Sequence, residues 1–261
     1  MKARAHFLTL AAVAVYGFLF WACAGSKKTT APPATIKVPT YDYAPPTQDK
    51  AKSAQVVFLM VDPQYQDKFQ YSSYKLFSDF SKAMAADFNE ALTSKGFSVR
   101  GPFEYYDQVV YSDKKESDLL LQAEIDFDIN SSNVNWSELP VYVSGRGRNA
   151  VYRTEYSYSG FYVLSGKINL VVAEPITKEK LWAKSIPLKQ KQINIAPYYR
   201  TTRQLDYSTA FTRDAGVMNP MIEALEDYYK QIFTTAWVHL DPSELAALKK
   251  EVMEIREKKK Y

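Results

Sequence analysis

Three arginines and a tyrosine form the strongest candidate for a binding site in this sequence. Arg146 and Arg148 alternate with glycines in the segment Gly145–Arg148, and Tyr152 and Arg153 follow shortly afterwards. Flanking glycines favour an open loop, and guanidinium groups offer paired donors that match a carboxylate. The pattern predicts that these arginines bind an acidic ligand such as an acidic sugar, with tyrosine rings available for stacking. The alternative is a solvated hairpin loop with cross-strand tyrosines.

A second group of polar residues is acidic. Glu124, Asp126 and Asp128 alternate with apolar residues, so they project from one face of an expected strand. Calcium needs oxygen ligands that converge from several directions, whereas side chains two residues apart on a strand point in parallel. We therefore interpret this face as solvated, and we expect no metal site.

Catalysis has little support among the residue types present. His239 is the one histidine that remains after an expected leader is removed. The sequence holds no Gly-x-Ser-x-Gly nucleophile motif and no glycine-rich phosphate loop. Carboxyl groups brought together by folding would be the remaining route to acid–base chemistry. We expect a protein that is not an enzyme and that carries no cofactor.

Aromatic segments and net charge bear on the kind of partner. Tyr105–Tyr106 and residues 198–203 mix tyrosine with polar residues, which is typical of interaction loops or of loops packed over a core. The net charge of +4 over 261 residues is too small to indicate a nucleic-acid partner.

The amino terminus has the parts of a secretory signal. Lys2 and Arg4 make a short basic start, and the run Leu8–Ala22 holds no charged residue. That run is shorter than the roughly 20 residues that a spanning helix needs, which favours a signal peptide over residues 1–22. Cys23 follows directly and is the one cysteine of the chain, which excludes an intrachain disulfide.

The segment Phe20–Cys23 resembles the signal of bacterial lipoproteins, in which a small residue precedes the cysteine that is acylated. Ala22 and Cys23 match this pattern, whereas leucine is usual at the position of Phe20 and Trp21 is bulky. The resemblance implies cleavage between Ala22 and Cys23 and fatty acid such as palmitate on Cys23. Several acyl chains hold a protein at a membrane without a spanning helix. The alternative is an uncleaved anchor with a chance cysteine.

Residues 23–53 have the composition of a tether. They hold five prolines together with several threonines. Such composition buries little surface and favours extended polyproline conformations. We expect a lipidated spacer over residues 23–53 and a single globular domain over residues 54–261.

The expected domain opens with a strand, a helix and a second strand. Val56–Val61 is an uninterrupted apolar run, typical of a strand buried on both faces. Between Tyr74 and Lys95 apolar residues recur at spacings of three and four, which predicts a helix that Gly96 ends. Phe97–Val99 alternates as a second strand, so the two strands are expected to be parallel.

Strands dominate the middle of the chain. Leu119–Asn130 alternates apolar with polar residues over its whole length. Ser165–Val172 alternates again, Glu174–Lys178 has the residues of a turn, and Leu181–Leu188 is the expected partner strand.

Two helices are expected to close the chain. Asn219 and Pro220 have the types that begin a helix, and Asp241–Glu244 has the pattern of a capping box for the next one. The predicted fold class is therefore α/β, or α+β, with a mixed β-sheet packed by one N-terminal helix and two C-terminal helices.

Several pieces of the domain resemble the neuraminyllactose-binding haemagglutinin lipoproteins, which are surface adhesin-like proteins of Gram-negative bacteria. The pieces are Val56–Leu59, Phe69–Ser72, Lys95–Val99, Ser112–Glu116, Leu170–Pro175 and a C-terminal helix that ends in lysines. Their order and spacing match over most of residues 55–260. The family carries a lipid-modified N-terminal cysteine, which the resemblance places at Cys23.

The name of that family comes from sialic acid binding, which is ascribed to a short segment rich in lysine and arginine after the mid-chain strand. In the corresponding region this chain has Arg146, Arg148 and Arg153 and no lysine-rich segment. By the order of its elements alone, the domain is also similar to the periplasmic α/β domain of curli-secretion lipoproteins.

Two functions follow from these expectations. The first is a lipid-anchored outer-membrane lipoprotein with a non-catalytic, adhesin-like body that binds a glycan or a protein. The alternative is a periplasm-facing accessory lipoprotein of an envelope secretion or appendage assembly. Ala24 favours the outer membrane, because aspartate after the cysteine retains lipoproteins in the inner membrane of enteric bacteria. Protease treatment of intact cells separates the two, since it removes a surface body and spares an inward one.

Overall fold

The computed structural model describes residues 35–46, 56–195, 199–202 and 215–260. The internal contacts of the chain divide it between Ala34 and Thr35, and the second unit contains all the described residues. The predicted signal peptide and Cys23 lie outside the described residues. None of the helices within the described ranges combines the length and the apolar character that crossing a membrane requires.

The predicted strand, helix and second strand are confirmed. β1 (Val57–Val61) pairs in parallel with β3 (Ser98–Phe103), and α2 (Lys75–Ser94) connects them. Gly96 follows the helix with a φ of 88°, a conformation that costs glycine little. Alternate side chains of β1 enter two different buried clusters, one under α2 and one on the opposite face of the sheet. Burial on both faces is what the uninterrupted apolar run of this strand predicts.

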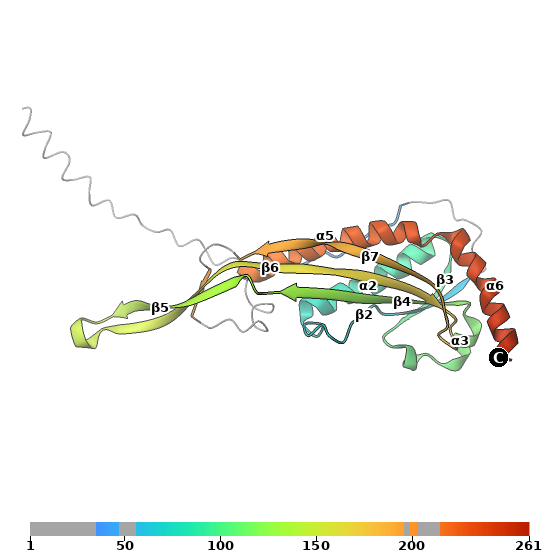
Figure 1. Cartoon of the computed structure of the whole chain (residues 1–261), viewed down its shortest axis with the longest axis horizontal. Helices are drawn as coiled ribbons and strands as arrows, with labels where there is room; N and C mark the ends of the chain where they lie inside the picture. Colours follow the sequence, from blue (N-terminus) through green and yellow to red (C-terminus); the bar gives the residue numbers. More distant parts are fainter. Residues whose placement is uncertain (1–34, 47–55, 196–198, 203–214, 261) are drawn as a thin grey trace, which may run out of the picture. The chain divides into compact units, whose positions relative to one another are not determined.

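The strands form the predicted mixed sheet (Figure 1). Its order is β3-β1-β4-β6, with β7 (Lys180–Asn194) on the other side of β6 (Val151–Ala173). β4 (Leu119–Asn130) runs parallel to β1 and antiparallel to β6. The short strand β2 (Gln64–Tyr65) pairs with β4 beyond the end of β1.

The two predicted C-terminal helices, α5 (Ala215–His239) and α6 (Pro242–Lys259), are present. α2 and α5 bury their apolar residues in the same cluster, on one face of the sheet. Tyr228 of α5 joins helix and sheet, because its buried hydroxyl donates to the carbonyl oxygens of Leu164 (2.9 Å) and Lys189 (2.7 Å). Burial of this hydroxyl raises the pKa of Tyr228 to about 12.

The start that we predicted for the first of these helices is wrong. Asn219 and Pro220 lie inside α5, which is already helical at Ala215. Instead of capping the helix, the Asn219 side chain accepts the backbone N–H of Lys37 (2.7 Å) and donates to the carbonyl oxygen of Thr35 (3.0 Å). These partners are distant in sequence, so the local capping pattern does not reveal them.

Residues 35–46, here called the strap, fall within the expected tether but pack against the domain. The Glu226 carboxylate of α5 accepts both the Lys37 ammonium (2.7 Å) and the backbone N–H of Thr40 (2.9 Å). The Lys37 ammonium holds the pKa of Glu226 below its usual range, although burial of the carboxylate opposes this shift. The composition of the segment predicts an extended chain but not this anchoring.

Two tyrosines of the strap pack against the helices. The Tyr41 ring lies 5.1 Å from that of Phe80 on α2 and 5.5 Å from that of Tyr229 on α5, between ring centroids. Tyr43 stacks on Phe233 of α5 at 5.2 Å. Aromatic pairs at such distances contribute beyond the area that they bury, so the strap is part of the folded domain.

Tyr41 allows a matched test of the strap. Its hydroxyl is buried without a hydrogen-bond partner among the described residues, and such a group costs about 1–3 kcal/mol. We expect Tyr41→Phe to keep or slightly raise the free energy of unfolding, whereas Tyr41→Ala lowers it by about 2–4 kcal/mol because the ring contacts are lost. Urea denaturation followed by circular dichroism measures both. A large loss in Tyr41→Phe would contradict the unpaired hydroxyl.

The predicted cap of α6 is confirmed at Asp241 but not at Glu244. Asp241 Oδ1 accepts the backbone N–H groups of Ser243 (3.0 Å) and Glu244 (2.9 Å). The Glu244 carboxylate, which a capping box directs back to the cap residue, instead accepts the indole N–H of Trp182 on β7 (2.8 Å). A buried indole N–H needs an acceptor, so this tertiary contact replaces half of the local motif.

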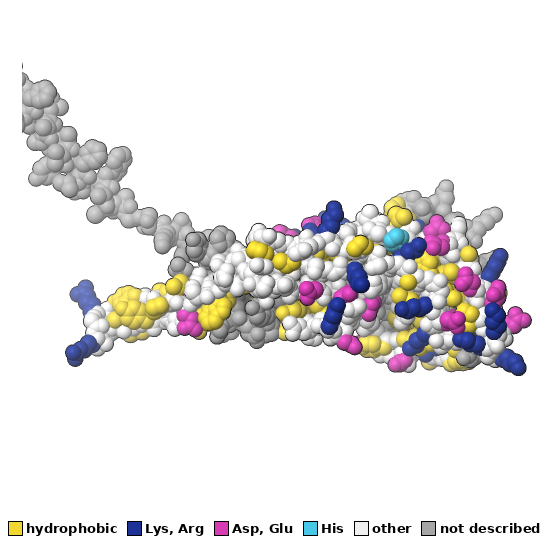
Figure 2. Space-filling view, viewed as in Figure 1, with side chains coloured by type: hydrophobic (Ala, Val, Ile, Leu, Met, Phe, Trp, Pro, Cys, Tyr) yellow, Lys and Arg dark blue, Asp and Glu magenta, His cyan; other side chains and the backbone are white. Residues whose placement is uncertain are grey.

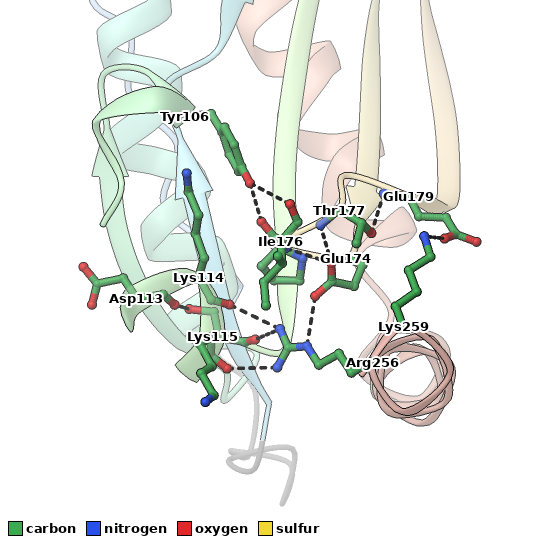
Figure 3. A network of polar contacts seen from close by, with 12 residues as sticks. Tyr106, Asp113, Lys114, Lys115, Glu174, Ile176, Thr177, Glu179, Arg256 and Lys259 are labelled. Atoms are coloured by element: carbon green, nitrogen blue, oxygen red, sulfur yellow. Dashed lines mark hydrogen bonds and ion pairs between the residues drawn. The ribbon is translucent and has the colours of Figure 1, made fainter. Parts of the chain in front are cut away.

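A buried ion pair holds the end of α6 against the sheet (Figure 3). Glu174, in the turn after β6, is fully buried, and its Oε1 accepts Nε of Arg256 at 2.9 Å. Its other oxygen accepts two backbone N–H groups of the same turn, at 2.8 and 2.5 Å. The remaining guanidinium nitrogens donate to three carbonyl groups of α3 (Tyr111–Glu116) and the residue after it. One arginine therefore joins three elements that are far apart in the sequence.

Arg256→Ala should lower the free energy of unfolding by about 3–5 kcal/mol, because it leaves the Glu174 carboxylate buried without a counter-ion. Urea denaturation measures the loss. Lys258→Ala is the matched control, since it removes an exposed cation from the same helix and should change stability by less than about 0.5 kcal/mol. Equal losses in the two variants would show that the ion pair has no special role.

Candidate functional site

The predicted arginine loop lies at the tip of a long β-hairpin (Figure 1). β5 (Val134–Ser144) pairs antiparallel with the first part of β6, from Val134 opposite Gly160 toward the tip. The pairing of β6 with β4 covers the other part and stops at Val163. At about 3.4 Å per residue, segment 151–160 of β6 spans roughly 30 Å past that point. The structure therefore contains the hairpin that was the alternative interpretation of this region.

Two glycines permit the bends of this hairpin. At its base, Gly160 has a φ of 106°, and a Cβ there would lie 2.0 Å from the carbonyl oxygen of Asn133. At its tip, Gly145 has a φ of 92°, and a Cβ would lie 1.9 Å from the carbonyl oxygen of Asn149. Both positions exclude other residue types, so the shape of the tip is built into the sequence. The short 3₁₀ turn η2 (Gly147–Asn149) completes the loop.

One face of the hairpin is aromatic. Residues opposite each other on antiparallel strands share a face, and so do alternate residues along each strand. The register places five aromatic side chains on the same face: Trp136, Tyr142, Tyr152, Tyr156 and Tyr158. The rings of Tyr142 and Tyr152 meet edge to face at 5.9 Å, and those of Trp136 and Tyr156 are 6.3 Å apart.

This aromatic face is open to solvent both near the base of the hairpin and near its tip. Trp136, Tyr142 and Tyr152 expose 52%, 54% and 59% of their surface. Figure 2 shows apolar side chains gathered along the hairpin and basic side chains at its end. Exposed aromatic surface that adjoins arginine is typical of interaction sites, because the rings bind apolar surface and the cation selects an anion.

The structure separates one of the four predicted residues from the others. Arg146 and Arg148 lie at the exposed tip, and neither side chain has a hydrogen bond or ion pair within the described ranges. Tyr152 follows on the aromatic face. Arg153 projects from the opposite face, where its guanidinium binds the Glu155 carboxylate at 3.0 and 2.5 Å. Neighbours on a strand point to opposite faces, so Arg153 does not join the site.

The sequence reasoning missed Trp136 and most of the strand that carries the tyrosines. The expected strand began at Ser165, whereas β6 begins at Val151. Segment 151–160 lacks the alternating aliphatic residues that indicate a strand packed on a core, because its alternate residues are mostly tyrosines, with one threonine. A search for aromatic residues with a period of two would have found this strand.

The acidic face of β4 carries interactions with cations and an amide. Asp126 accepts the ammonium of Lys68 at 2.7 Å and lies 3.8 Å from that of Lys167. Glu124 accepts the Asn169 amide at 2.9 Å. In the part of the chain that the structure describes, no group of histidine, cysteine, aspartate and glutamate side chains is arranged to hold a metal ion.

The two tyrosine-rich segments have different positions. Tyr105 is exposed, whereas Tyr106 lies under the ammonium groups of Lys114 and Lys178, each within 4 Å of the ring centre. Its hydroxyl donates to the carbonyl oxygen of Pro175 at 2.6 Å, which makes it a packing residue. In the other segment, β8 (Tyr199–Thr201) pairs with β6 at the base of the hairpin.

Comparison with known proteins shows the fold. No protein-family model matches the chain, and no curated protein sequence matches it. A neuraminyllactose-binding hemagglutinin homolog from Helicobacter pylori has a similar structure, with a TM-score of 0.54 and 15% identity over 83% of this chain and 98% of that one. A protein from Xanthomonas campestris has a TM-score of 0.39 at 9% identity, covering 82% and 99% of the two chains. A lipoprotein from Neisseria meningitidis has a TM-score of 0.29 at 12% identity, covering 52% and 83%.

The likeness to the Helicobacter pylori protein shows a shared fold. It agrees with the family resemblance of the sequence at that level.

Proposed function

We propose that the chain is a lipid-anchored protein of the bacterial outer membrane whose domain binds an acidic saccharide at the tip of the β5–β6 hairpin, without catalysis. One observation carries this proposal. The guanidinium groups of Arg146 and Arg148 have no partner among the described residues, and they adjoin an exposed aromatic face.

The chemistry of the tip suits a sugar that bears a carboxylate. A guanidinium group without an internal partner keeps its paired donors for a ligand, and no ion pair within the described residues has to break when a carboxylate binds. The exposed rings of Tyr142 and Tyr152 offer a flat apolar surface for the sugar ring. The Helicobacter pylori protein of the same fold is described as a homolog of a neuraminyllactose-binding hemagglutinin, which supports this ligand class.

The exposure of the site supports binding rather than reaction. The arginines and rings lie on an open hairpin, whereas catalytic groups work best in sites that exclude water. An open site at the end of a long hairpin is accessible to a ligand on another surface. This arrangement favours the adhesin-like role over the accessory role within an envelope assembly.

Replacing Arg146 and Arg148 together by alanine should lower the affinity for sialylated glycans by about tenfold or more, because each charged hydrogen bond contributes about 1.5–3 kcal/mol. A glycan array probed with the purified chain measures the change. Arg153→Ala is the matched control and should keep binding, since Glu155 already holds that guanidinium. Thermal unfolding should be unchanged in the double variant. Unchanged glycan binding in the double variant would contradict the proposed site. A domain that binds proteins but no glycan would contradict it as well.

The lipid anchor rests on Cys23, which follows an uncharged run and a small residue. Cells fed labelled palmitate should incorporate it into the wild-type chain and not into Cys23→Ser, because the serine hydroxyl does not replace the thiol that is acylated. The wild-type protein should fractionate with the outer membrane. An unmodified thiol behind an intact leader, found by mass spectrometry of the native protein, would contradict the anchor.

A further inference from the structure

A polar cleft of about 610 Å³ opens at the carboxyl ends of β1 and β3. The lining residues that could contact a ligand through polar or aromatic groups include Asp62, Gln64, Ser78, Lys82, Glu104 and Tyr105. None of the residues that line it belongs to the hairpin strands, so the cleft is separate from the arginine tip.

The cleft lies where the chain topology of open α/β sheets commonly creates a ligand-binding crevice. β1 and β3 are adjacent and parallel, and the chain leaves their ends toward opposite faces. After β1 it reaches α2, which packs in the main core. After β3 it reaches η1 (Tyr106–Gln108) and Val109, which pack in the cluster on the other face. Diverging connections leave a crevice at the carboxyl edge, where open α/β sheets bind ligands.

Hydrogen bonds hold the two strand ends that line the cleft. The Gln64 amide donates to the carbonyl oxygens of Asp62 and Glu104, each at 3.0 Å. The backbone N–H of Asp62 donates to the carbonyl oxygen of Phe103 at 2.8 Å. These contacts join the ends of β1 and β3 directly, so the cleft is formed before any ligand arrives.

The charged groups of the cleft have no fixed partners. The carboxylates of Asp62 and Glu104 and the ammonium of Lys82 make no hydrogen bond or ion pair within the ranges that the structure describes. Burial, together with the Glu104 charge, raises the pKa of Asp62, and Lys82 opposes this shift. Two carboxylates and one ammonium line the cleft, so it favours a cation over an anion.

We propose that this cleft binds a saccharide unit that carries an amine, that is, an amino sugar. Asp62 and Glu104 would accept the ammonium and neighbouring hydroxyl groups, and the Ser78 hydroxyl adds a further donor and acceptor. The ring of Tyr105, 51% exposed at the rim, offers a surface for stacking. This site is independent of the arginine tip, which selects ligands of the opposite charge.

The test is a titration of the purified full-length chain with glucosamine, in which saturation-transfer NMR measures binding. Glucose and glucuronate are titrated for comparison. In the variant with Arg146 and Arg148 both replaced by alanine, which lacks the tip site for acidic sugars, we expect glucosamine to bind more tightly than glucose, and glucuronate to bind least. Asp62→Asn should weaken glucosamine binding about tenfold and remove its preference over glucose, because a charged hydrogen bond is lost. Glu104→Gln, at an exposed position, should shift the affinity in the same direction.

Two controls separate this proposal from its alternatives. Asp67→Asn removes an exposed carboxylate that does not line the cleft and should leave glucosamine binding unchanged. The variant with Arg146 and Arg148 both replaced by alanine should also keep it, so either site can fail without the other. Asp62→Asn should raise the melting temperature while it weakens binding, since a carboxylate kept for a ligand opposes folding. Absence of glucosamine binding, or equal binding in Asp62→Asn, would overturn the proposal.

Discussion

The continuous backbone pairing of β6 is the constraint on which the rest of this structure depends. Its 23 residues form one strand, of which one part belongs to the core sheet and the other to the hairpin. The part that ends at Ala173 lies between β4 and β7 in the sheet, where its alternate side chains enter the main core. The other part pairs with β5 and presents the aromatic face. Because both parts belong to one uninterrupted strand, the position of the hairpin is coupled to the core rather than to a separate loop.

The ends of the domain are held by polar contacts between residues far apart in sequence. Glu226 and Asn219 bind the strap to α5. Arg256 binds α6 to the turn after β6 and to α3. Asn219 binds two backbone groups and Arg256 binds three, whereas Glu226 binds one backbone N–H and an ammonium. These contacts stabilise a geometry that hydrophobic packing alone leaves free. The folded unit therefore includes the strap.

The two candidate binding sites differ in charge and in construction. The arginine tip stands on an exposed strand pair, and its cations face solvent without internal partners. The cleft at the carboxyl ends of β1 and β3 bears two carboxylates, and Gln64 joins the two strand ends that line it. Ligands of opposite charge would therefore be selected at different places on one domain, each by groups that the fold leaves unpaired.

Local periodicity was enough to predict the elements that lie in the core. The apolar run of β1, the helical spacing of α2 and the alternation of β4 each follow from burial against a neighbour, and all three are confirmed. The cap at Asp241 is confirmed for a related reason, because its partners are the next residues in the chain. The expected signal and acylation at Cys23 are properties of the sequence that the described residues do not include.

Tertiary structure decided whatever depends on partners distant in sequence or on strand register. Arg153 was grouped with the arginine tip by proximity in the chain, but one residue along a strand reverses the direction of a side chain. Asn219 and Glu244 have the types that cap helices, yet each binds a more distant group that would otherwise lack a partner. The strap has the composition of an extended tether, and the aromatic surface formed by α2 and α5 is what holds Tyr41 in place. Local patterns encode the period of an element, whereas its partners exist only after the chain has folded.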